Sequence, residues 1–370
     1  MGTSSRVSFD AAACLPSRYP ACECGLCGPA CPVAAIAMAD GVPELVADCI
    51  GCGACAAACP TGALQTEGFG LPTFGVGTPS EIYIDCWRVP LADSPRGALR
   101  VPCFGGINVG WLLAVFDLSG ERRIRLLRRG ACEGCSAGGA IRSASDALEE
   151  AAELLIACDV LPAAVPRFVE RPLSSPLAPS IPEAGAAVAI DRRRFFRGLL
   201  GGAARAAEDV QRAAAPAGPV RLRQLAQPVA RMRTVAALTR IAARRSKVVP
   251  AVAVPQLSVG DCDASGTCAA VCPTGALQRV ESAGGESAEL RFHGTLCVAC
   301  GECATACPTR ALRVSPVGGR PEVDVLARWT GKSCGECGEL FFGPGGDACP
   351  GCIKRKNLQH GLAALSWPPA

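Results

Sequence analysis

Apolar residues between positions 80 and 160 follow strand spacing and helix spacing in turn. Each predicted strand is a short apolar run that ends in or beside a cysteine, and each predicted helix has apolar residues three and four positions apart. The strands are predicted at 81–86, 98–103 and 123–132, and the helices at 109–117 and 145–157. This alternation predicts a small parallel α/β domain over residues 80–160.

The cysteines of this region follow the predicted strands. In parallel sheets, ligands bind beyond the carboxyl ends of the strands, so these cysteines are expected to meet at one edge. Four thiols from separate loops can hold a 2Fe-2S cluster or a metal ion. The alternative is that they are buried structural cysteines. The four residues are Cys86, Cys103, Cys132 and Cys135.

The pattern is lost after residue 160. Residues 161–190 are rich in proline, alanine and serine, which predicts a semi-extended linker. Residues 191–250 are predicted to be a basic helical segment, since 191–247 hold 14 Arg or Lys and 3 acidic residues. It is either a solvated helix pair or an electrostatic dock for an acidic partner or the membrane surface.

Cysteine content decides the class of protein. The 370 residues include 25 cysteines and only two histidines. Most cysteines form C-x-x-C groups, and the N-terminus has no apolar signal segment, so metal binding is favoured over secreted disulfides. No apolar run is long enough to span a membrane. These features predict a cytoplasmic protein of several domains.

The first cysteine block is predicted to form a domain over residues 14–70. It contains one complete run of C-x-x-C-x-x-C-x-x-x-C-P, at residues 49–60, and one altered run at 22–32. In the altered run Ala21 stands where the first cysteine is expected, and Cys22 comes one residue late. The two cysteine sets are Cys22, Cys24, Cys27 and Cys31, and Cys49, Cys52, Cys55 and Cys59.

A second block, predicted over residues 256–318, repeats this arrangement. Its later run, at 297–308, is complete, and its earlier run has Ser265 where the second cysteine is expected. Its two cysteine sets are Cys262, Cys268 and Cys272, and Cys297, Cys300, Cys303 and Cys307.

Both blocks resemble the bacterial two-cluster ferredoxins, and this resemblance implies 4Fe-4S clusters with crossed ligation. One cluster would bind Cys49, Cys52, Cys55 and Cys31, and its neighbour Cys24, Cys27 and Cys59 with Cys22 as fourth ligand. In the second block, one cluster would bind Cys297, Cys300, Cys303 and Cys272. The other site would have Cys262, Cys268 and Cys307. The three thiols suit a 3Fe-4S cluster, or a 4Fe-4S cluster with Ser265, Asp263 or water on the fourth iron. Three or four 4Fe-4S clusters are therefore expected, while Cys14 and Cys158 are interpreted as core thiols.

Two C-x-x-C pairs, eleven residues apart, predict a zinc ribbon at residues 329–362. Structural zinc is favoured over iron because a closed site of four cysteines suits zinc best. The ligands would be Cys334, Cys337, Cys349 and Cys352. The predicted fold class is thus α+β: two ferredoxin-like domains, a central parallel α/β domain and a C-terminal zinc ribbon.

The central cysteine phrases V-P-C-F-G-G and G-A-C-E-G-C resemble the small iron–sulfur subunit of methyl-viologen-reducing hydrogenases. That resemblance implies a 2Fe-2S cluster that passes electrons to a reductase subunit. The basic string at 192–198 resembles a twin-arginine signal, and similar openings precede ferredoxin-type accessory proteins of molybdenum oxidoreductases.

The sequence has no G-x-G-x-x-G after a strand, no P-loop and no H-E-x-x-H motif. The first hypothesis is therefore an electron-transfer protein that has no catalytic site of its own. Its partners would be redox subunits, namely a dehydrogenase or hydrogenase and an acceptor reductase. The second is an accessory factor for a molybdenum oxidoreductase. A nucleic-acid-binding regulator is disfavoured because Tyr and Trp are scarce.

Overall fold

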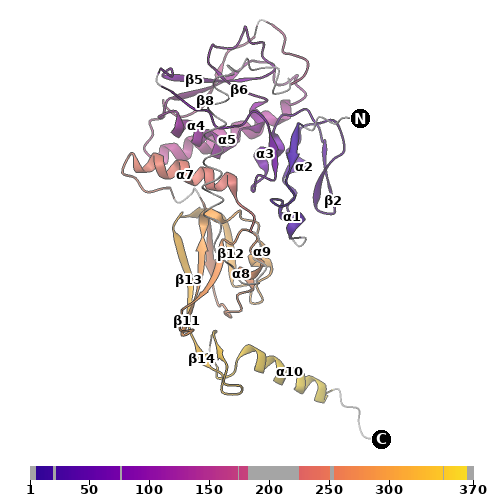
Figure 1. The fold of residues 1–370 in the computed structure, drawn as a ribbon, viewed down its shortest axis with the longest axis vertical. Helices are drawn as coiled ribbons and strands as arrows, with labels where there is room; N and C mark the ends of the chain where they lie inside the picture. The colour runs from indigo at the N-terminus through magenta and orange to yellow at the C-terminus, as the bar shows by residue number, and fades with distance from the viewer. Residues whose placement is uncertain are drawn as a thin grey trace, which may run out of the picture.

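The computed structural model describes residues 6–19, 22–75, 77–173, 175–181, 225–250, 254–344 and 346–364. Figure 1 shows a central α/β unit with the N-terminal cysteine-rich unit beside it. Helix α7 (Val229–Ala243) lies between the central unit and the second cysteine-rich unit, and a small C-terminal unit lies at the far end.

The central unit contains a four-stranded sheet, and every neighbouring pair of its strands is parallel. The predicted parallel sheet is therefore confirmed. The strand order is β6-β5-β7-β8. The strands are β5 (Glu81–Cys86), β6 (Leu99–Val101), β7 (Arg123–Arg128) and β8 (Arg167–Glu170), and the helices are α4 (Val109–Leu118) and α5 (Ile141–Ala157).

Strand β8 lies within the segment predicted as a linker. It pairs with β7, and the buried Arg125 of β7 donates to the carbonyls of Val165 at 3.1 Å and Ala163 at 3.0 Å. These contacts fix the chain on entry to β8, so the sheet gains a strand from a proline-rich segment. Residues 182–190 of that linker lie outside the described residues.

The core of the central unit lies between the sheet and its helices. Apolar side chains of β5 and β7 pack against α4 and α5, with Ile84, Leu126, Phe116 and Leu155 fully buried. Helix α4 is buried along almost its whole length, because α7 covers its other side. This firm core holds the ends of the strands in place, where the cysteines lie.

The N-terminal cysteine-rich unit consists of short elements joined by cysteine loops. Strand β1 pairs with β4, β2 pairs with β3, and each C-x-x-C loop leads into a helix of one turn. The elements are β1 (Val7–Phe9), α1 (Leu15–Arg18), α2 (Cys27–Ala30), β2 (Ile36–Ala39), β3 (Val42–Leu45), α3 (Ala54–Ala58) and β4 (Leu64–Thr66).

The second cysteine-rich unit repeats this plan with longer strands. One sheet has the order β10-β11-β13, and β9 pairs with β12, all antiparallel. The elements are β9 (Val254–Val259), α8 (Thr267–Val271), β10 (Leu277–Glu281), β11 (Ser287–His293), α9 (Glu302–Thr305), β12 (Leu312–Gly319) and β13 (Val323–Thr330).

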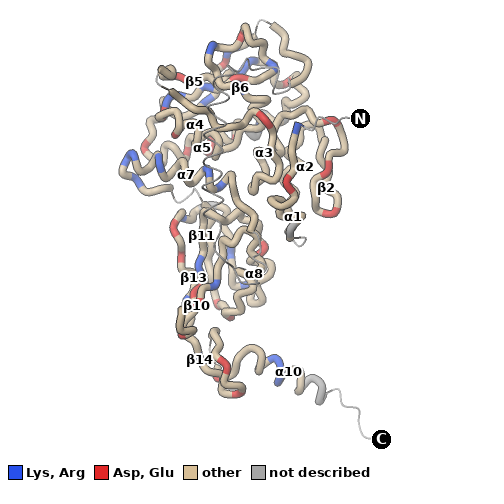
Figure 2. Tube along the Cα trace, viewed as in Figure 1, with Lys and Arg blue, Asp and Glu red and all other residues tan. Residues whose placement is uncertain are grey.

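Helix α7 comes from the predicted basic segment, and its C-terminal arginines bind the chain itself. Asp117 of α4 accepts from Arg240 at 2.6 Å and from Arg244 at 2.7 Å. Glu121 pairs with Arg244 and Arg245. Figure 2 shows basic residues at one end of α7. In the described part of the segment, these charges therefore fix α7 to the central unit. The string at 192–198 lies outside the described residues.

The C-terminal unit is a short hairpin followed by a helix. Strands β14 (Lys332–Ser333) and β15 (Leu340–Phe341) pair antiparallel, and α10 (Pro350–Ala364) follows. None of the described helices is both long enough and apolar enough to cross a membrane.

Candidate metal centres

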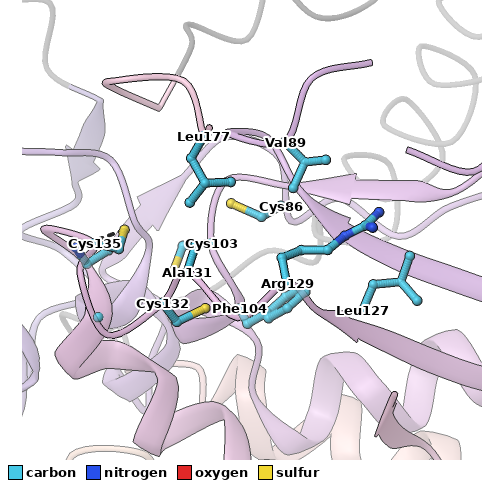
Figure 3. A pocket seen from close by; sticks show the side chains of 12 residues that line it. Cys86, Val89, Cys103, Phe104, Leu127, Arg129, Ala131, Cys132, Cys135 and Leu177 are labelled. Atoms are coloured by element: carbon cyan, nitrogen blue, oxygen red, sulfur yellow. Dashed lines mark hydrogen bonds between the residues drawn. The ribbon is translucent and has the colours of Figure 1, made fainter. Parts of the chain in front are cut away.

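Four cysteines converge at the carboxyl edge of the central sheet. Figure 3 shows their side chains around one hollow, together with Arg129. Cys86 ends β5, and Cys103 follows β6, while the other two lie in the loop after β7. The structure thus brings Cys86, Cys103, Cys132 and Cys135 together, as the sequence predicts. These four residues are called the central site.

A buried ion pair holds this edge of the sheet. Asp85, which is fully buried, accepts from Arg129 at 2.5 Å and 3.1 Å and from Ser94 at 2.8 Å. Asp85 precedes Cys86, and Arg129 follows β7. A charge-assisted bidentate pair of this kind fixes two strand ends relative to each other.

Hydrogen-bond donors point at the sulfurs of the central site. The backbone N–H groups of Gly105 and Ala137 donate to Cys103 and Cys135, both at 3.4 Å. The Arg88 guanidinium donates to Cys135 Sγ at 2.8 Å, and the carbonyl of Ala178 holds it at 2.6 Å. Such donors stabilise a negatively charged sulfur, which is the form that binds metal.

Burial opposes ionisation of these thiols. It raises the pKa of Cys86 to about 11 and that of Cys103 to about 12. Metal would therefore have to displace protons from the central site. The hydrogen-bond donors and the grouping of four sulfurs fit a metal or cluster that replaces those protons.

The complete run of the N-terminal unit forms a second group, called site A. The thiols of Cys31, Cys49 and Cys52 surround Cys55, and burial raises the pKa of Cys55 to about 12. Backbone N–H groups donate to Cys31 at 3.2 Å and to Cys49 at 3.4 Å. Site A therefore brings together the four cysteines expected for the first cluster.

The neighbouring hollow, called site B, differs from the expectation in one cysteine. Its lining includes Cys24, Cys27 and Cys59, as expected, but the fourth thiol is Cys14. Cys14 stands directly before α1 and is buried. The sequence interpretation missed Cys14 as a member of this site. One signal was available, because the first run lacks a cysteine at the regular position and Cys14 is the one cysteine that precedes the run.

Cys22, the expected fourth ligand, lies in another place. It is 3% exposed and packs with Leu15 and Ala226, beside Val298 of the second unit. Its thiol hydrogen-bonds the sulfur of Cys300, which raises the pKa of Cys22 and lowers that of Cys300 to about 7. Cys22 therefore does not line site B, although it packs beside Cys24 of that site.

Site C is the complete group of the second unit. Cys272, Cys297, Cys300 and Cys303 line one hollow, as the crossed pattern implies. Burial raises the pKa of Cys297 to about 11 and that of Cys303 to about 12. Cys272 directly follows α8, whereas the other three come from the loop before α9 and from α9 itself.

Site D is the remaining group, Cys262, Cys268 and Cys307, in which burial and, to a smaller extent, the neighbouring Cys307 thiol raise the pKa of Cys262 and Cys268. Burial raises the pKa of Cys268 to about 11. Ser265 is exposed and accepts from Thr267 at 3.3 Å, while Asp263 accepts from the Ser265 backbone N–H at 3.1 Å. The side-chain oxygens of Ser265 and Asp263 thus both accept local hydrogen bonds.

The C-terminal unit holds a fifth set of four thiols, called the ribbon site. The sulfurs of Cys334, Cys337, Cys349 and Cys352 all lie within 4.8 Å of one another. The Cys349 backbone N–H donates to Cys334 at 3.1 Å and lowers the pKa of Cys334 to about 6. This compact set fits a single metal ion or a small cluster. Cys158, by contrast, is fully buried in the central core.

Comparison with models of protein families gives two matches. A 4Fe-4S dicluster domain matches residues 261–311, and a 4Fe-4S binding domain matches residues 46–65. The search of curated proteins found no match. The first match covers sites C and D, and the second covers most of site A. The chain therefore contains ferredoxin-type 4Fe-4S domains, and it is an iron–sulfur protein of the ferredoxin-like kind.

Proposed function

We propose that this chain is an electron-transfer protein that relays electrons through several iron–sulfur clusters. Its partners are a dehydrogenase or hydrogenase and an acceptor oxidoreductase subunit. The observation that carries the proposal is the grouping of the cysteines. The ferredoxin-type sequences fold into separate thiol sets, and backbone N–H groups donate to sulfurs in several of them. Thiolates held in this way are the usual ligands of such clusters.

The geometry supports the following ligand sets. Sites A and C each offer four thiols to a 4Fe-4S cluster, and site B does so through Cys14. Site D offers three, which suits a 3Fe-4S cluster or a 4Fe-4S cluster with an oxygen ligand from solvent. The central site suits a 2Fe-2S cluster, and the ribbon site suits zinc.

Anaerobic purification followed by metal analysis and EPR tests the proposal. These sites together should hold roughly 17 or 18 iron per chain and one zinc, with several EPR signals in the reduced protein. Iron below about four per chain would contradict the electron-transfer function.

Substitution Cys14→Ser tests the assignment of site B. If Cys14 is a ligand, the variant loses up to about four iron or converts one cluster to the 3Fe-4S form, because a thiolate ligand has been removed. Cys158→Ala is the matched control, since it removes a buried thiol of the central core that lines none of the three cysteine hollows. Wild-type iron in both variants would contradict the assignment of Cys14.

A further inference from the structure

The cysteine sites are joined to one another by packed side chains. Cys52 of site A packs in one cluster with Cys103 and Cys135 of the central site. The backbones also meet there, because a Cβ on Gly53 would lie 3.2 Å from the Cα of Gly106. Gly53 has a φ of 82°, which a glycine adopts without strain. The central site and site A are therefore neighbours.

The next contacts continue the series within each unit. Cysteines of sites A and B pack together, with Cys27 and Cys55 buried and Cys31 and Cys59 beside them. In the second unit, Cys268 of site D packs with Cys272, Cys297 and Cys303 of site C. Each ferredoxin-type unit therefore holds its two sites side by side.

The junction between the two units is the contact of Cys22 with Cys300. Cys24 of site B and Val298, next to site C, pack against the same buried cluster as Cys22. The segment before α7 also packs at this junction, because the N–H of Ala226 donates to the carbonyl of Pro273 at 3.0 Å. Leu225 lies so close to Gly275 that a Cβ there would be 2.4 Å from its Cδ1. Site B and site C therefore lie on either side of this packed contact.

We infer that the sites form one unbranched series, in the order central site, A, B, C and D, and that Cys22 joins site B to site C without being a ligand of either. The inference rests on the proposed electron-transfer function. In each step one electron leaves a reduced site and enters its oxidised neighbour, with no bond made and no proton moved. A one-electron donor and a one-electron acceptor protein complete the balance at the two ends.

The role of Cys22 is tested with the full chain, purified anaerobically. Cys22→Ala is expected to keep the wild-type iron content and to shift the reduction potential of one cluster downward, because a hydrogen bond to the ligand sulfur of Cys300 is lost. Cys158→Ala is the control for the loss of a buried thiol, and its potentials should equal those of the wild type. Loss of about four iron would identify Cys22 as a ligand and overturn the inference. Unchanged potentials would also overturn it.

The order of the sites is tested by EPR of the chain reduced with dithionite, in which neighbouring reduced clusters broaden each other's signals. Removing site B with Cys24→Ala and Cys27→Ala should narrow the signals of both site A and site C. Removing site D with Cys262→Ala and Cys268→Ala should narrow that of site C alone. If the EPR signal of site C keeps its width when site B is removed, the proposed order is wrong. A wild-type chain without clusters would instead contradict the proposed function.

Discussion

At the scale of single residues, Arg88 is the side chain that most directly affects the central site. Its guanidinium donates to Cys135 Sγ at 2.8 Å and is held by the carbonyls of Ala178 and Pro179. A cation and hydrogen-bond donor at a ligand sulfur stabilises the reduced, more negative form of a cluster. If the central site binds a cluster, as the proposed function requires, Arg88 is expected to raise its reduction potential.

Arg88→Met is expected to lower the reduction potential of the central cluster while the iron content stays at the wild-type value. A redox titration followed by EPR measures the potential. Arg96→Met is the control, because Arg96 is exposed and lies in the same unit. An unchanged potential in Arg88→Met would show that the guanidinium does not act on the cluster.

The buried thiols predict how cluster assembly depends on pH. The pKa values of Cys55, Cys103 and Cys303 are raised to about 12, so these thiols are protonated in the folded, metal-free chain at pH 7 to 9. Assembly must release their protons, and the released protons make binding stronger as the pH rises towards 12. Reconstitution of the metal-free chain should thus be more complete at pH 9 than at pH 7, as measured by bound iron. Equal incorporation at both pH values would contradict this.

At Cys14 and Cys22 the structure differs from what the sequence pattern predicts. The spacing rule grouped most of the candidate ligands as the structure does, since C-x-x-C loops bring their own sulfurs together. Which cysteine supplies the fourth thiol of site B depends on how the segment before α1 folds back onto the unit. The local spacing of the cysteines does not predict that fold. Spacing alone therefore favours Cys22, the nearer cysteine along the chain, although Cys22 packs beside Val298 of the second unit.

At the scale of elements, helix α7 changes the interpretation of the basic segment. A count of charges cannot tell an exposed basic face from one that meets acidic residues of the same chain. Here Asp117 on α4 is 4% exposed in its side chain and accepts from two arginines of α7 and its C-cap. The contact is tertiary, so the sequence alone did not show it.

Asp117→Asn should weaken the packing of α7 on α4. The arginines are about half exposed, so the expected loss is about 1–3 kcal/mol of unfolding free energy, between the values for surface and buried pairs. Chemical denaturation of the central unit measures it. The control is Asp159→Asn, whose exposed pair with Lys247 should contribute less than about 1 kcal/mol. Equal effects of the two changes would mean that the α4–α7 ion pairs do not fix the helix.

At the scale of the whole molecule, the sequence does not show how the units meet. The regular motifs and the strand–helix alternation each arise within one unit, and they are therefore readable from local spacing. The contacts between units depend on single side chains far apart in the sequence, such as Cys22 with Cys300. The position of the C-terminal unit likewise depends on contacts between side chains that are far apart in the sequence.

The C-terminal unit packs on the loop of site D, at the far end of the series. Phe342 is 8% exposed and packs with Ala264 and Trp329, and the Arg279 guanidinium lies 5.3 Å from the centre of its ring. Ala264 lies between Cys262 and Ser265. The hairpin that carries Phe342 is held by the ribbon site, so metal there should keep Phe342 over the loop of site D.

Cys334→Ser should therefore remove one zinc per chain and leave the iron of sites A, B and C in place, while the iron of site D becomes more accessible to a chelator. Zinc and iron analysis, together with the rate of iron loss to an external chelator, measures both effects. Lys356→Ala is the control, because it removes only an exposed pair with Glu336 from the same unit. If zinc is lost and the rate of iron loss equals that of the control, the C-terminal unit does not protect site D. Release of most of the iron along with the zinc would instead show that this unit stabilises the whole chain.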